Sequence, residues 1–340
     1  ITIILIFLVI YGFVSIMLLS KINYLVDLFF IPLSLIVFIG VGQAINYLEE
    51  KQHRLYLTTA FGKYINKHLL KQIIEHKQEL KLGGGKRTIS IFFSDIRGFT
   101  SLSEKLSPEE LVNLINRYLT EMTRIILKYD GTVDKFIGDA IMAFWNAPLL
   151  QENHAELDCE CAIEQIKALK KLQEELVKEG LPKIEIGCGI HTGEAVIGNM
   201  GSDERFDYTA IGDSVNLCSR LEGLTKEYGV NIIISEDTYK IIKNKFNCRK
   251  LDVVKVKGKK IPVVIYELCI DYNKEFCKLY EEALELYFKG NFRKALSIFR
   301  EALKKKQGDK SCDLFIKRCE EYIKNPPSED WDGSFEMKTK

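Results

Sequence analysis

The stretch of sequence that decides the fold is TISIFFSDIRGFTSL, from Thr88 to Leu102. Its apolar run Ile89–Phe93 is short and is rich in aromatic and β-branched residues, which predicts a buried β-strand. The strand ends at Asp95. We therefore expect this carboxylate at the edge of a sheet.

Helices and strands alternate after this first strand. Ser107-Pro108-Glu109-Glu110 has the pattern of a capping box with proline in the first turn, and predicts a helix that runs to about Lys128. Later segments predict strands at 132–137, 140–145, 183–193, 194–201, 230–235, 251–258 and 262–268, with helices at 156–178 and 214–228. The order strand–helix–strand–strand–helix–strand predicts an α+β, ferredoxin-like fold, an antiparallel sheet with helices on one face.

Two aspartates stand at comparable places in this pattern. Asp95 closes the first strand, and Asp139 lies in the tight turn of the hairpin TVDKFIGDAIMAFW. If these strands are neighbours, the two carboxylates meet at one edge of the sheet. Such a pair favours a hard divalent cation, Mg²⁺ or Mn²⁺. For either aspartate alone, a capping or turn role would be the better interpretation.

Four motifs together resemble one protein family. FSDIRGFT, DKFIGDAIMAFW, GIHTGEAVIGNMGS and YTAIGDSVNLCSRLEGL follow the order and spacing of class III adenylate cyclases of bacterial type. The resemblance covers about residues 86–270 and implies a catalytic domain that converts ATP into 3′,5′-cyclic AMP and pyrophosphate in signal transduction. It further implies two Mg²⁺ ions per site, for which Mn²⁺ can substitute.

The resemblance assigns roles to individual residues. Asp95 and Asp139 match the metal-binding aspartates, with Ile96 as a further ligand through its carbonyl. Lys135 and Thr209 match the pair that reads adenine, which is typical of one subgroup of the family. The residues expected to contact phosphate are Arg97, Gly98, Phe99 and Thr100, through their amides, and Lys257, through its side chain.

Asn216 and Arg220 match the pair that orients the ribose and stabilises charge in the transition state. In this family the metal aspartates and the Asn/Arg pair come from opposite subunits, so the resemblance implies a homodimer with shared sites. Two alternatives stay open, a guanylate cyclase and a catalytically silent, dimerising nucleotide-binding module. Lys135 and Thr209 argue against the first, because a guanine reader carries Glu at the lysine position, and the complete residue set argues against the second.

Two apolar runs lie at the start of the chain. Residues 3–19 and 28–48 each approach the ~20 residues that cross a bilayer as a helix, and the connector SKINYLVD is short. Basic residues after the second run place the rest of the chain in the cytoplasm by the positive-inside rule. We therefore expect a multi-pass protein of the cell inner membrane, with residues 1–48 as a hairpin in the lipid bilayer. A signal peptide or a buried core helix is the alternative.

The remaining segments flank the catalytic domain. Residues 49–85 predict a helical signalling linker that ends in a Gly83–Gly85 hinge, and the start at Ile1 indicates part of a longer protein. Residues 271–325 resemble a tetratricopeptide repeat with a following helix. One repeat cannot bury its face alone, so we expect it to pack on the cyclase domain, the next helix or a dimer mate, with a protein partner as the alternative. Residues 326–340 predict a flexible tail.

Bulk composition excludes some classes of protein. The 340 residues carry a formal net charge of +1, so no basic field favours nucleic acid as a partner. None of the nine cysteines forms a CxxC pair, which argues against a structural zinc site and favours reduced thiols.

Overall fold

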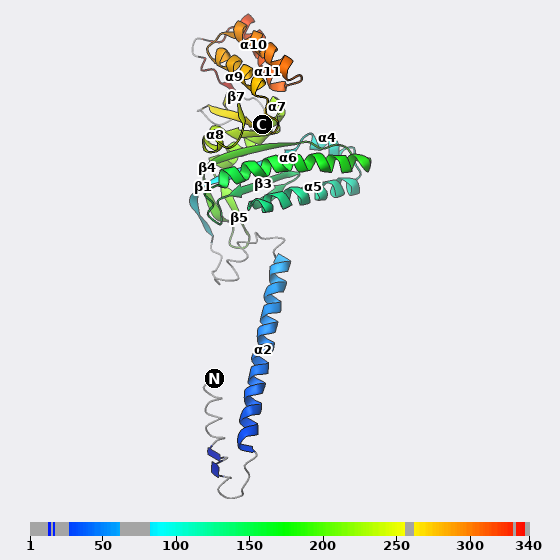
Figure 1. Ribbon diagram of the computed structural model, residues 1–340, viewed down its shortest axis with the longest axis vertical. Helices are drawn as coiled ribbons and strands as arrows, with labels where there is room; N and C mark the ends of the chain where they lie inside the picture. The colour runs from blue at the N-terminus through cyan, green and yellow to red at the C-terminus, as the bar shows by residue number, and fades with distance from the viewer. Residues whose placement is uncertain are drawn as a thin grey trace. The chain divides into compact units, whose positions relative to one another are not determined.

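The structure is a computed structural model that describes residues 13–14, 16–17, 27–61, 82–255, 262–328 and 331–336. The chain divides into two compact units, residues 1–78 and 79–340 (Figure 1).

The first unit contains the helix α2, which spans Asp27–Phe61. In the described part of the chain, no helix is long and apolar enough to cross a membrane. The prediction of two transmembrane helices, and with it of a multi-pass inner-membrane protein with the bilayer as partner, is therefore wrong. α2 continues from the apolar run into Glu49, Glu50 and Lys51 without a break, and charged side chains are costly in hydrocarbon. Most of the first predicted run and residues 62–81 of the predicted linker lie outside the described residues.

The second unit is built on one mixed sheet, in the order β2-β3-β1-β4-β6-β8-β7-β9, with β5 paired to β4 off this path. The strands are β1 (Gly83–Ile96), β2 (Thr132–Ile137), β3 (Ala140–Trp145), β4 (Ile186–Gly201), β5 (Phe206–Ile211), β6 (Ile232–Ser235), β7 (Cys248–Lys255), β8 (Val263–Leu268) and β9 (Phe335–Glu336). The antiparallel neighbours β2-β3-β1-β4 form the predicted ferredoxin-like core. β4–β6 and β7–β9 are parallel pairs, which makes the whole sheet mixed.

The predicted glycine hinge is part of a strand. β1 begins at Gly83, and Gly84 pairs with Gly198 of β4. A Cβ atom on Gly84 would lie 2.7 Å from the Ile197 carbonyl oxygen, so this close pairing requires glycine. The three glycines therefore extend β1 rather than break the chain.

The helices of the second unit are α4 (Phe99–Ser103), α5 (Pro108–Lys128), α6 (His154–Lys178), α7 (Asp213–Tyr228), α8 (Glu236–Ile242), α9 (Lys274–Phe288), α10 (Phe292–Lys305) and α11 (Lys310–Lys324). The predicted capping box at the start of α5 is confirmed. The Glu110 amide donates to Ser107 Oγ at 3.3 Å, and the Ser107 amide donates to the Glu110 carboxylate at 2.9 Å.

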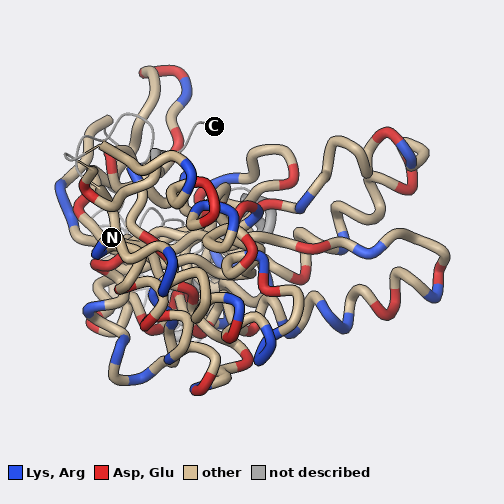
Figure 2. Tube along the Cα trace, turned by 90° about the horizontal axis from the view of Figure 1, so that it is seen from above, with Lys and Arg blue, Asp and Glu red and all other residues tan. Residues whose placement is uncertain are grey.

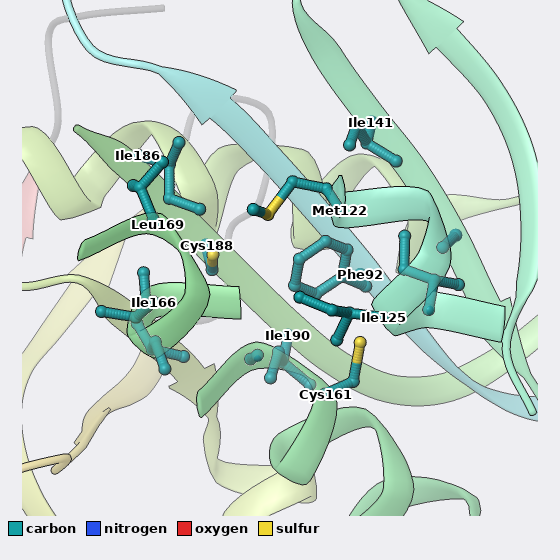
Figure 3. Packing of buried hydrophobic residues seen from close by; sticks show 14 of the residues in the cluster. Phe92, Met122, Ile125, Ile141, Cys161, Ile166, Leu169, Ile186, Cys188 and Ile190 are labelled. Atoms are coloured by element: carbon teal, nitrogen blue, oxygen red, sulfur yellow. The ribbon is translucent and has the colours of Figure 1, made fainter. Parts of the chain in front are cut away.

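Helices cover both faces of the sheet, rather than one as predicted. Phe92 of β1 packs on one face with Met122 and Ile125 of α5 and Cys161 of α6 (Figure 3). Ile91, which points the other way because side chains alternate along a strand, packs with Cys218 of α7. Since consecutive positions of β1 are apolar, both faces need a cover, and α7 supplies the second.

Two glycines of β4 allow α7 to approach the sheet closely. A Cβ atom on Gly189 would lie 2.4 Å from the Glu222 amide nitrogen, and one on Gly187 would lie 2.0 Å from Thr225 Oγ1. Both distances are shorter than any real van der Waals contact. Glycine at these two positions therefore fixes where α7 lies.

The C-terminal helices pack on α7 and so on the domain that was predicted at residues 86–270. Leu217 and Leu221 of α7 share one apolar cluster with Tyr280 of α9 and Phe315 of α11. The segment that was predicted to be a flexible tail also contacts the fold where it is described. Trp331 packs on Tyr287, and β9 pairs with β7. Residues 271–336 thus add to the core of the second unit in the part that the structure describes.

Buried charges join these helices to the sheet. The Arg318 guanidinium of α11 lies 2.6 Å from the Asp252 carboxylate of β7, which also accepts a hydrogen bond of 2.5 Å from the Tyr228 hydroxyl at the end of α7. Burial raises the pKa of Asp252, while Arg318 and Tyr228 oppose that rise. The Arg318 guanidinium also stacks on the Phe335 ring at 3.7 Å. This cluster links α7, β7, β9 and α11.

Removing the cation from this cluster should destabilise the second unit strongly. Arg318→Met leaves Asp252 buried without its ion partner, so we expect the free energy of unfolding to fall by about 3–5 kcal/mol. Arg300→Met is the matched control, because Arg300 pairs with Glu320 at the exposed surface between α10 and α11, and should cost less than about 1 kcal/mol. Urea unfolding of both full-length variants measures the difference, and equal losses would contradict the structural role given to Arg318.

Candidate active site

The structure brings Asp95 and Asp139 together at the end of β1. Asp95 is the penultimate residue of that strand, and Asp139 follows Gly138 in the turn between β2 and β3. The backbone amide of Ile96 donates hydrogen bonds to Asp95 Oδ1 at 3.0 Å and to Asp139 Oδ2 at 3.2 Å. One amide therefore anchors both carboxylates.

Burial and the neighbouring carboxylate change the protonation of Asp139. Burial raises the pKa of Asp139 to about 7, and the neighbouring Asp95 carboxylate adds to the rise. Like charges that share a site resist simultaneous ionisation, and a divalent cation removes this penalty. The donor set therefore fits a hard metal ion. In the part of the chain that the structure describes, no group of three or more His, Cys, Asp and Glu side chains is placed to hold one.

Glu222 is a third carboxylate near the site, and the sequence did not single it out. It lies on α7, and burial raises its pKa to about 8, with Asp95 and Asp139 adding to the rise and Arg97 opposing it. A signal was present, because Glu222 is four residues after the buried Cys218, on the helix face that packs against the sheet.

The predicted phosphate loop follows directly. Gly98 has φ 68° and precedes the short helix α4, and no side chain caps that helix. Amides in the first turn of a helix lack intrahelical acceptors, so those of Phe99 and Thr100 are available. The Arg97 amide is engaged, since it donates to the Glu185 carbonyl at 2.8 Å. The available donors therefore lie after Arg97.

Lys135 and Thr209 lie against the same carboxylate, that of Asp134. Lys135 Nζ is 3.3 Å from Asp134 Oδ1, and the Thr209 hydroxyl donates to Asp134 Oδ2 at 2.6 Å. Lys135 comes from β2 and Thr209 from β5, two strands that are not neighbours in the sheet order. The sequence did not single out Asp134, although it precedes Lys135 directly.

Asn216 and Arg220 share one face of α7, as their spacing predicted. Asn216 is exposed and Arg220 half-buried, whereas Cys218 and Glu222 on the opposite side of the helix approach the backbone of β4. The Asn/Arg pair therefore points away from the sheet. Among the described residues, no hydrogen bond or ion pair joins Asn216 or Arg220 to Asp95 or Asp139. Lys257, the last predicted site residue, lies outside the described residues.

The concentration of carboxylates is local. Lys and Arg are interspersed with Asp and Glu along the described trace (Figure 2), in keeping with a formal net charge of +1. The acidic character of the site therefore comes from Asp95, Asp139 and Glu222 rather than from a broad acidic surface.

Known proteins share this domain. Adenylate cyclase 1 of Rhizobium meliloti is 36% identical over 208 residues, 61% of this chain and 31% of the relative. An adenylate cyclase of Anabaena cylindrica is 43% identical over 189 residues, 54% of this chain and 37% of the relative. The chain thus spans about one third of the length of these curated relatives.

Solved structures of cyclases are similar to this chain. The adenylyl cyclase CyaB from P. aeruginosa has a TM-score of 0.53 at 42% identity, over 57% of this chain and 98% of that one. The guanylyl cyclase Cya2 has a TM-score of 0.52 at 38% identity, over 56% of this chain and 98% of that one. The adenylate and guanylate cyclase catalytic domain family matches residues 84–269. With this match over more than half of its length, the chain belongs to the class III family of adenylate and guanylate cyclases.

Proposed function

We propose that this chain is an adenylate cyclase of the Lys/Thr subgroup, which converts ATP into 3′,5′-cyclic AMP and pyrophosphate. The observation that carries the proposal is the placement of Lys135 and Thr209 on one carboxylate. A lysine donates to a ring nitrogen of adenine, and a threonine oxygen accepts from the exocyclic amine. The adenylate cyclases among the relatives support the same nucleotide, whereas the guanylyl cyclase at 38% identity keeps GTP as the alternative substrate.

The carboxylates would hold the metal. Asp95 and Asp139 would bind two Mg²⁺ ions, with Mn²⁺ as a substitute and the Ile96 carbonyl as a further ligand. When bound, the ions lower the pKa of the ribose 3′-hydroxyl and stabilise charge on the departing pyrophosphate. In the reaction a bond forms between O3′ and the α-phosphorus. The bond between the α-phosphorus and the oxygen that bridges to the β-phosphate breaks, so that pyrophosphate leaves, and the hydroxyl proton passes to solvent.

The other residues bind and orient the nucleotide. Amides after Gly98 and the Lys257 side chain would contact phosphate oxygens, because peptide N–H groups and cations are common phosphate ligands. Asn216 would orient the ribose. Arg220 would stabilise charge on the α-phosphate, since a guanidinium matches phosphate oxygens in two hydrogen bonds.

Two copies of the chain would build each site. Asn216 and Arg220 point away from the sheet of their own chain, so a second copy can supply the carboxylates that they face. Apolar side chains near the site are also about half exposed, at 48% for Phe136, 54% for Ile137 and 53% for Ile211. Such side chains would lose their exposure to water at a protein interface. A homodimer with two equivalent sites accounts for both observations.

Activity should depend on Arg220. With Mn²⁺ or Mg²⁺, the full chain should form cyclic AMP from ATP in preference to cyclic GMP from GTP, and a chromatographic assay measures both products. Arg220→Ala should lower the rate by about 10²–10³, the scale for losing one preorganised transition-state contact. Arg293→Ala, outside the region of the family match, is the control and should retain the rate. Absence of cyclic AMP under all conditions would exclude the proposed function.

Mixing two inactive variants should restore activity. Asp139→Ala removes a metal ligand, and Arg220→Ala removes the transition-state contact, so each homodimer is inactive. A mixed dimer regains one complete site, and random pairing in an equal mixture should give about one quarter of wild-type activity. The measurement is the rate of cyclic AMP formation after the two chains are unfolded and refolded together. Failure of the mixture, in samples where exchange is verified by tagged chains, would reject the shared site.

The metal-free site should be destabilising at high pH. Because the folded-state pKa of Asp139 is about 7, the carboxylate lowers stability as pH rises from about 4 to 7, and the full penalty is present above 7. Asp139→Asn should therefore raise Tm at pH 8 by about 2–4 °C, which corresponds to about 1 kcal/mol after allowance for solvent screening. At pH 5 the difference should shrink. Calorimetry in EDTA measures it, with the exposed Asp203→Asn as control, and an unchanged Tm at pH 8 would contradict the raised pKa of Asp139.

A further inference from the structure

Asp134 contacts both residues that are proposed to read the nucleotide base, Lys135 and Thr209. Its side chain is 0% exposed. Oδ2 accepts from the Thr209 hydroxyl at 2.6 Å and from the Ala210 amide at 3.3 Å. Oδ1 accepts no hydrogen bond from the described residues, and the Lys135 ammonium lies 3.3 Å from it. The carboxylate therefore contacts both residues that would read the purine.

A β-bulge creates this arrangement. In the β2–β3 pair, Val133 lies opposite Ala143 and Lys135 lies opposite Met142, so Asp134 is the extra residue. A bulge breaks the alternation of side chains along the strand and re-aims those beside it. The ion pair between the sequence neighbours Asp134 and Lys135 follows from this break, because regular strand neighbours point to opposite faces.

The carboxylate decides how Thr209 can bond to anything else. A threonine hydroxyl has one proton and two lone pairs, and an ionised carboxylate only accepts. Burial raises the pKa of Asp134, but Thr209 and Lys135 oppose that rise. The Lys135 ammonium lies beside Oδ1 of the carboxylate. The hydroxyl proton of Thr209 is thus committed to Asp134. In a hydrogen bond to a ligand, the Thr209 hydroxyl can therefore act only as the acceptor and the Lys135 ammonium only as the donor.

This acceptor–donor pattern distinguishes the two purines. Adenine presents a donor at its exocyclic amine and an acceptor at the adjacent ring nitrogen N1. Guanine presents the reverse at the same two positions, an acceptor at O6 and a donor at N1–H. Placing guanine there would leave two pairs of like groups facing each other, and unpaired polar groups in a closed site are costly.

We propose that Asp134 is a specificity-determining residue, which selects adenine over guanine by fixing the direction of the Thr209 hydroxyl. The inference rests on the proposed function, and it concerns a residue that touches the base readers rather than the nucleotide. Asp134 is thus a positioning residue. A purely structural role, in which Asp134 only ties β2 to β5, would lower activity with both nucleotides alike.

Asp134→Asn is the informative substitution, because it keeps the shape and removes the charge. The amide nitrogen of Asn can donate to Thr209 Oγ1, which frees the hydroxyl proton to face a guanine O6. We expect the ratio of kcat/KM for ATP to that for GTP to fall by about 10-fold or more, the scale of one reversed hydrogen bond in a closed site. Asp207→Asn, an exposed aspartate on β5, is the matched control and should leave the ratio unchanged.

Thr209→Val and the double variant complete the test. Valine has the shape of threonine without the hydroxyl, so it should lower the ratio by itself, and adding Asp134→Asn to it should change the ratio by less than about 3-fold. Thr209→Val also serves if Asp134→Asn fails to fold. The inference is overturned if kcat/KM falls equally for ATP and GTP in Asp134→Asn. It is also overturned if Thr209→Val keeps the wild-type ratio of kcat/KM for ATP to that for GTP. A wild-type chain that turns over neither nucleotide overturns the proposed function itself, and the inference with it.

Discussion

The Ile96 amide, which holds Asp95 and Asp139 side by side, is the contact on which the rest of the site depends. Two carboxylates at one amide repel each other, and burial together with this repulsion raises the pKa of Asp139. Only a rigid frame keeps such a pair together without a cation. That frame is β1, which pairs with β3 on one side and with β4 along its whole length on the other.

The site depends, second, on the placement of α7, the helix that carries Asn216 and Arg220. From one side, Gly187 and Gly189 let it lie directly on β4. From the other side, the C-terminal helices pack on it, and the Arg318–Asp252–Tyr228 cluster ties its last residue to β7 and α11. These helices lie beyond the family match over residues 84–269. They brace α7 rather than forming a separate appendage.

Much of the catalytic domain could be predicted from sequence, because its signals are local. The capping box of α5, the hairpin at Gly138-Asp139 and the spacing of Asn216 and Arg220 each depend on a few neighbouring residues. The errors came where long-range context decides. The three glycines at 83–85 looked like a hinge but pair closely with β4, and the apolar run 28–48 continues into a charged helix. Asp134 and Glu222 were missed because burial and a bulge, rather than residue type, give them their roles.

The central claim is that one nucleotide site takes its carboxylates from one copy of the chain and its Asn/Arg pair from another. A crystal structure of the full chain with Mn²⁺ and an ATP analogue that cannot cyclise tests it most directly. We expect Asp95 and Asp139 of one protomer, and Asn216 and Arg220 of its partner, around the same triphosphate. A nucleotide bound by both sets from a single protomer, or bound away from Asp95 and Asp139, would contradict the account.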